Sequence, residues 1–162
     1  MNKKLVLIVL VAFVVMSSMG MSYASDKDVS FISCGTDDNE VAENVGGVSA
    51  YITESGDLIV SLINAYPGYE AYVDFTIQYT DASEGSGPVY IKGIYITNDY
   101  DGVEMDVVVT DSGGINHIPI NTILYPDGTL DGLLTVTMLD GAEEAESYSF
   151  GVDIDFSEEP PI

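Results

Sequence analysis

Apolar and polar side chains alternate with a period of two along much of the chain after residue 24. The clearest example is the segment 70–79, which follows a Pro-Gly pair. One face of this segment is apolar throughout and carries Ala71, Val73, Phe75, Ile77 and Tyr79. Such alternation is typical of a strand in an antiparallel sheet with one face against the core. We therefore expect this strand to bury that face.

The same pattern predicts about eight strands separated by turn-forming residues. They are expected at 28–34, 45–53, 58–63, 70–79, 89–97, around 105–109, 133–139 and 148–156. Pro67 and Gly68 are suited to the central positions of a type II turn, with Gly68 at positive φ. The segment 117–132 is predicted to be irregular, and 141–147 to form at most a helical turn. The expected fold is all-β, a two-sheet antiparallel β-sandwich of jelly-roll or immunoglobulin-like type.

The first 24 residues differ from the rest of the chain. Lys3 and Lys4 precede an unbroken apolar run, Leu5 to Met16, and Ser22-Tyr23-Ala24 supplies small residues at the −3 and −1 positions of a cleavage site. This is the pattern of a cleaved export signal, and an uncleaved N-terminal anchor is the alternative. The expected product is secreted and lies outside the cell or on its surface.

Residues 25–162 are predicted to form one domain with an N-terminal extension. We expect residues 25–44 to form an N-terminal strand and an acidic linker that tethers it, 45–157 to form the sandwich, and 158–162 to form a flexible tail. Val29, Phe31, Ile32 and Cys34 are the apolar side chains of the first strand. They are its candidate contact residues, should it pair with another subunit.

Acidic residues dominate the charge of the predicted domain. All 27 acids lie after residue 24, together with only Lys27 and Lys92, so the formal charge of that part is 2 − 27 = −25. This excludes nucleic acid as a partner and disfavours an anionic membrane surface, because both are bound through Lys and Arg. It favours solubility and attraction of divalent cations.

The sequence contains no signature of an enzyme. His117 is the one histidine, Cys34 the one cysteine, and arginine is absent. A lone thiol in an exported protein is either buried as a small hydrophobe or joined to another chain. His117 lies between glycine and proline in a segment without a catalytic motif, so we expect a loop residue with no role in catalysis.

Calcium is the one cofactor that the composition suggests, because hard cations take carboxylate oxygens. The strongest candidate ligands are Asp99, Asp101 and Glu104, in a turn that does not match an EF-hand loop. Solvated acidic turns are the alternative. Seven tyrosines crowd residues 66–100, and those not needed in the core are candidates for a subunit contact.

Several segments together resemble the camelysin/TasA-like exported fibre proteins and the related archaeal bundling pilins. They are the end of the leader at 20–26, the Asn64 to Tyr69 corner, the Val73 to Ile77 strand and the Gly85 to Val89 loop, with a weaker match at 145–154. The resemblance implies a jelly-roll subunit that polymerises outside the cell. Its N-terminal strand would complete the sheet of the next subunit.

Two classes of function follow from these observations. The first is a secreted structural subunit of an extracellular fibre, pilus or biofilm matrix that assembles with itself by strand exchange. The second is a monomeric cell-surface β-sandwich module that binds a divalent cation or a partner protein.

Overall fold

The computed structural model describes residues 27–39, 46–81, 87–98, 100–110, 116–117, 120–143 and 146–160. These residues form ten strands and no helix. The strands are β1 (Lys27–Asp38), β2 (Gly47–Ile52), β3 (Leu58–Ala65), β4 (Glu70–Asp81), β5 (Val89–Thr97), β6 (Val103–Thr110), β7 (Asn116–His117), β8 (Thr122–Leu124), β9 (Thr129–Met138) and β10 (Glu146–Ser157). No described segment could therefore cross a bilayer as a helix.

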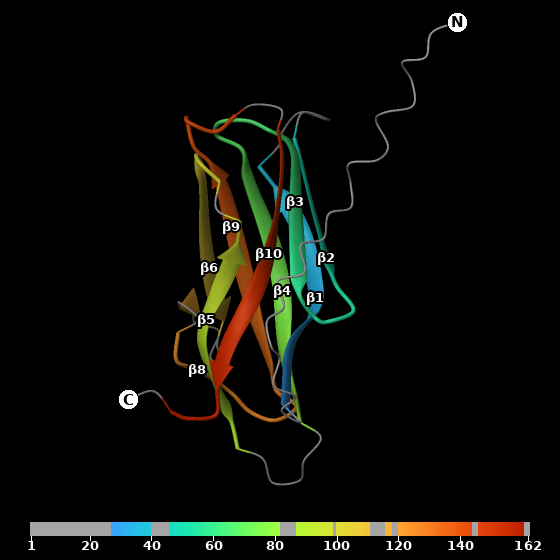
Figure 1. The fold of residues 1–162 in the computed structure, drawn as a ribbon, viewed down its shortest axis with the longest axis vertical. Coiled ribbons are helices and arrows are strands. Elements are labelled where there is room, and N and C mark those ends of the chain that lie inside the picture. Colours follow the sequence, from blue (N-terminus) through green and yellow to red (C-terminus); the bar gives the residue numbers. More distant parts are fainter. Residues whose placement is uncertain are drawn as a thin grey trace, which may run out of the picture.

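The strands form two five-stranded sheets that pack face to face as a β-sandwich (Figure 1). Sheet A has the order β1-β4-β9-β6-β7 and sheet B the order β2-β3-β10-β5-β8, and every pairing is antiparallel. The predicted fold class is confirmed. The chain crosses between the sheets repeatedly, and β1 and β2 form the two sheet edges on one side of the molecule.

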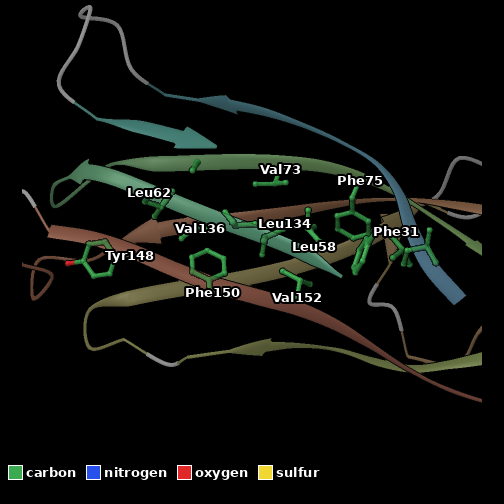
Figure 2. Close-up of a cluster of buried hydrophobic side chains, with 14 of the residues drawn as sticks. Phe31, Leu58, Leu62, Val73, Phe75, Leu134, Val136, Tyr148, Phe150 and Val152 are labelled. Atoms are coloured by element: carbon green, nitrogen blue, oxygen red, sulfur yellow. The ribbon is translucent and has the colours of Figure 1, made fainter. Parts of the chain in front are cut away.

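The core lies between the sheets and is built by the alternating faces that the sequence predicted. All five apolar side chains of β4 are at most 2% exposed. Opposite them, Leu58, Val60 and Leu62 of β3 and Phe150 of β10 are also buried, and Figure 2 shows several of these side chains in one layer. Burial of this apolar layer is what holds the two sheets together.

The Pro-Gly corner takes the chain from sheet B to sheet A. Gly68 has φ 88°, and the Tyr69 amide donates to the Tyr66 carbonyl at 2.9 Å, as a type II turn requires. The Gly68 amide also donates to the Met138 carbonyl at 2.8 Å, which fastens the corner to the end of β9. The predicted turn is confirmed.

The structure departs from the predicted strands in two places. The segment 117–132, predicted to be irregular, contains β8 and the first residues of β9. Leu130 and Gly132 continue the inward face of β9. At Gly132 the Phe75 ring fills the space that a Cβ would need, so the position requires glycine. An alternation with glycine at an inward position is hard to recognise in a sequence, because glycine has no apolar side chain that would mark the buried face. The Gly141–Glu143 part of the predicted helical turn forms a tight turn.

The first strand is longer than its apolar residues indicate. β1 continues through Gly35, Thr36, Asp37 and Asp38, which the sequence pattern places in the acidic linker. These residues pair with Asp74 to Ala71 of β4 through the backbone, and an edge strand tolerates polar side chains on its open face. The linker outside β1 is therefore shorter than predicted, and its residues 40–45, like the predicted leader, lie outside the described residues.

Candidate interface at the β1 edge

β1 forms the edge of sheet A and pairs with one strand, β4, over its whole length. Three of its four candidate contact residues face the core. Phe31 is 3% exposed, and Val29 and Cys34 are partly buried against the same cluster. The Phe31 ring meets the Phe75 ring edge to face, with centroids 5.3 Å apart. Phe31 is thus the most deeply buried of the four candidate contact residues.

Ile32, the fourth candidate, points to solvent and is 48% exposed. The register shifts between Phe31 and Ser33, so Ile32 has no partner in β4. This β-bulge adds one residue and restores the inward direction at Cys34, three positions after Phe31. The sequence showed Phe31 and Ile32 as neighbouring apolar residues, but it contained no signal for the bulge that separates their roles.

A turn of sheet B covers the open edge of β1 at the bulge. The Phe31 amide donates to the Gly56 carbonyl at 3.0 Å. Gly56 has φ 86°, and a Cβ on it would lie 2.6 Å from the Ser30 Cβ, so only glycine allows this approach. One donor of the edge is therefore satisfied within the chain.

A second set of bonds holds the end of β1 at the Pro-Gly corner. The Asn39 amide donates to the Glu70 carbonyl, the Glu70 amide donates to Asn39 Oδ1, and Asn39 Nδ2 donates to the Gly68 carbonyl, each at 3.0 Å. The buried Tyr69 hydroxyl donates to Asp38 Oδ2 at 3.0 Å. We call these residues, Asp38, Asn39, Gly68, Tyr69 and Glu70, the corner clamp. Sequence reasoning missed the clamp because its two halves lie about thirty residues apart.

Cys34 and His117 are the residues on which nucleophilic or acid–base catalysis would depend. Cys34 is a free, partly buried thiol, and desolvation raises its pKa. A raised pKa keeps the thiol protonated, which suits a packing residue better than a nucleophile. His117 lies in β7, and its side chain is outside the described part of the structure.

The structure describes two of the three predicted calcium ligands. Asp101 and Glu104 are both exposed, Glu104 on the outer face of β6, while Asp99 lies outside the described residues. Among the side chains that the structure describes, no three of the types that bind metals lie close enough to share an ion. The calcium site stays a prediction.

Charges on the outer face of β4 lie close to one another. The Tyr72 hydroxyl donates to Glu70 Oε2 at 2.6 Å, and this hydrogen bond, followed by desolvation and the negative charges of Glu70 and Asp37, raises the pKa of Tyr72. Thr76 donates to Asp131 Oδ1 at 2.9 Å in the same face. A shallow hollow of about 460 Å³ lies here, across the junction of β1, β4 and β9. Its lining mixes polar and apolar side chains and includes Ser33, Cys34, Asp74, Phe75, Thr76 and Asp131.

Comparison with known proteins returned no match to a family model, a curated protein or a solved structure.

Proposed function

We propose that the protein is a secreted structural subunit of an extracellular fibre or matrix, and that subunits are joined when β1 of one chain occupies the edge of sheet A in the next. The observation that carries the proposal is the way β1 is attached. It is the first described strand, it lies at a sheet edge, and it pairs with β4 alone. Strand exchange of this kind reforms the same contacts between chains that are made within one chain.

The contacts of β1 with the rest of the chain can also form between neighbouring chains. Among the side chains of β1 that the structure describes, Phe31 is buried in the core, and Val29 and Cys34 are partly buried against it. Backbone bonds to β4 and Gly56, packing beside β2 and the corner clamp complete the attachment. Since exchange costs no native contact, chain concentration and the short segment after Asn39 would decide which form prevails.

The charge of the chain also fits a role outside the cell in which subunits are added one at a time. At a formal net charge of −23, free subunits repel one another, so non-specific association is suppressed. A strand inserted along a sheet edge overcomes this repulsion with directional backbone bonds.

A cross-linking experiment distinguishes exchange from a closed fold. Gly35 and Asp74 are direct partners across β1 and β4, and a Cβ at Gly35 meets nothing within 4 Å. In a Cys34→Ser background, Gly35→Cys with Asp74→Cys would form a disulfide wherever β1 pairs with β4. We expect oxidation of concentrated protein to give a ladder of covalent multimers on a non-reducing gel, and filaments by electron microscopy.

The matched control places a disulfide inside the body. Thr76 and Asp131 are direct partners in β4 and β9, and the Thr76 hydroxyl donates to Asp131 Oδ1 at 2.9 Å. Thr76→Cys with Asp131→Cys, in the same background, should give monomers only. If the Gly35–Asp74 pair also gives monomers only at every concentration, exchange does not occur. The chain would then be a self-contained surface module.

Peptide complementation gives a second test. A chain that begins at residue 40 lacks β1 and should bind a synthetic peptide of residues 26–39. The same peptide with Phe31→Asp should not bind, because it would bury a carboxylate against Phe75. A truncated chain that is folded but binds neither peptide would contradict the proposal.

A further inference from the structure

The outer face of sheet B carries a patch without charged residues. Three rows cross β2, β3 and β10 in register, and the third row continues into β5. The rows are Gly47-Ile63-Ser147, Ser49-Ser61-Ser149 and Tyr51-Ile59-Gly151-Thr97. Their neighbours along each strand point into the core, so these ten positions all face outward. We call them the neutral patch.

The neutral patch exposes large apolar side chains in an ordered way. Tyr51 is 58% exposed and Ile63 is 55% exposed, at opposite ends of the patch, and small serines lie between them. Tyr95, also 55% exposed, continues the apolar surface beyond Thr97. Figure 1 shows that β2, β3 and β10 run side by side here, so the patch is continuous across three strands.

The outer face of sheet A is different in character. Its corresponding rows are Asp37-Tyr72-Thr135-Asp106, Gly35-Asp74-Leu133-Val108 and Ser33-Thr76-Asp131-Thr110. Four of these twelve positions are aspartates, whereas the ten positions of the neutral patch contain no acid. Aspartates reappear on sheet B only in the next rows, where Asp153 and Asp155 lie opposite Tyr95 and Gly93. The acids are therefore arranged around the neutral patch and on the opposite face.

From this arrangement we infer that the neutral patch is a lateral contact with the same patch of a second copy of this chain. Two copies of residues 25–162, each with a formal charge of 2 − 27 = −25, repel each other wherever their acids meet, and the neutral patch removes that repulsion from the centre of a contact. A basic partner would find no opposite charge on the neutral patch, so it would bind the aspartates on the outer face of sheet A instead. A two-fold axis along the serine row would bring small residues together and set Ile63 of each copy against the Tyr51 and Ile59 end of the other.

The size of the neutral patch indicates a weak contact. Strands about 4.8 Å apart and outward residues about 6.7 Å apart give roughly 300 Å² for the ten positions of the neutral patch. Two such faces bury on the order of 600 Å², less than the roughly 1,200 Å² at which stable complexes begin. We therefore expect a dimer that dissociates at micromolar concentration and forms toward millimolar concentration.

Sedimentation velocity of residues 25–162 tests the inference directly. The fraction of dimer should increase with protein concentration. It should increase further when salt rises from about 0.1 M to about 1 M, because the Debye length falls from about 10 Å to about 3 Å and the repulsion between the surrounding acids is screened. Tyr51→Ser with Ile63→Ser should weaken the dimer at least tenfold. The control, Tyr125→Ser with Leu139→Ser, removes an equally exposed tyrosine and aliphatic side chain outside the neutral patch and should change nothing.

Two further variants each add one negative charge, one to the outer face of sheet B and the other to the outer face of sheet A. Ser149→Glu lies in the middle row of the neutral patch and should abolish the dimer, whereas Thr129→Glu, exposed on the outer face of sheet A, should not. A chain that stays monomeric at millimolar concentration and about 1 M salt refutes the inference. Equal effects of the patch variants and their controls also refute it.

This contact is independent of the exchange of β1. The patch variants leave β1 and β4 unchanged, so the Gly35→Cys and Asp74→Cys ladder reports exchange separately. If no dimer is seen in sedimentation but the disulfide ladder forms, only the neutral-patch contact is refuted. If the ladder does not form but the dimer does, only the proposed exchange of β1 is refuted.

Discussion

Replacement of Phe31 by alanine tests how firmly β1 is attached to the sandwich. Phe31 is 3% exposed, and its ring packs on Phe75 at an interplanar angle of 84°. Truncation of a buried phenylalanine costs about 3–5 kcal/mol, which includes the aromatic contact of about 0.5–1.5 kcal/mol. Because β1 is an edge strand that can shift toward the space left behind, we expect about 3 kcal/mol. That is a large part of a typical stability of about 5–15 kcal/mol.

The assay is urea unfolding followed by circular dichroism, with Ile32→Ala as the matched control. Ile32 is the adjacent residue and is 48% exposed, so its truncation should change the free energy of unfolding by only about 0.5 kcal/mol. Equal losses for the two variants, or a loss below about 1 kcal/mol for Phe31→Ala, would show that β1 is not anchored as described. In a Tyr51→Ser, Ile63→Ser background, which weakens the neutral-patch contact, a midpoint that rises with protein concentration would indicate that the contacts of Phe31 are made between chains.

Three further predictions concern packing, charge and metal. Gly132→Ala places a Cβ 2.2 Å from Phe75 Cζ and should cost at least about 1–3 kcal/mol in thermal unfolding, whereas Gly35→Ala, with open space around it, should be nearly neutral. Desolvation, and then the charge of Asp57, raise the pKa of Asp153, so the folded chain holds this proton more tightly than the unfolded chain. This tighter proton binding stabilises the folded chain at low pH, and the stabilisation is lost as pH rises through the raised pKa of Asp153. Asp153→Asn should therefore stabilise the chain at about pH 7 and have little effect at about pH 3, below the ordinary aspartate pKa. Asp155→Asn is the charge-matched control. Binding of calcium by the Asp99–Glu104 turn should raise the melting temperature in millimolar calcium beyond an ionic-strength control, and an unchanged melting temperature would contradict it.

The two proposed contacts use different surfaces of the same sandwich. Exchange of β1 uses the edge of sheet A, whereas the neutral patch lies on the outer face of sheet B. The acid-rich outer face of sheet A takes part in neither contact as a docking surface. Weak lateral contacts become effective when subunits are already joined in a row, because each one then forms at a high effective concentration.

The sequence alone determined the class of the fold and much of its core. Alternation of apolar and polar residues specifies which face of a strand is buried, so the inward side chains of β4 and the turn at Pro67-Gly68 were predictable from local chemistry. The long-range partners were not. The bulge at Ile32 and the corner clamp depend on residues that meet only after the sheets have formed.

Tertiary structure also decided how the surface is divided. Alternation places Tyr51 and Ile63 on the faces of their strands opposite the inward residues, and only the register of β2, β3 and β10 brings them together on a neutral outer face. The physical reason is that period-two alternation is local, whereas the neighbour of a residue across a sheet is set by strand order and register. A chain can therefore show which residues are apolar, but the assembled sheets decide which of them meet each other and which remain available to another molecule.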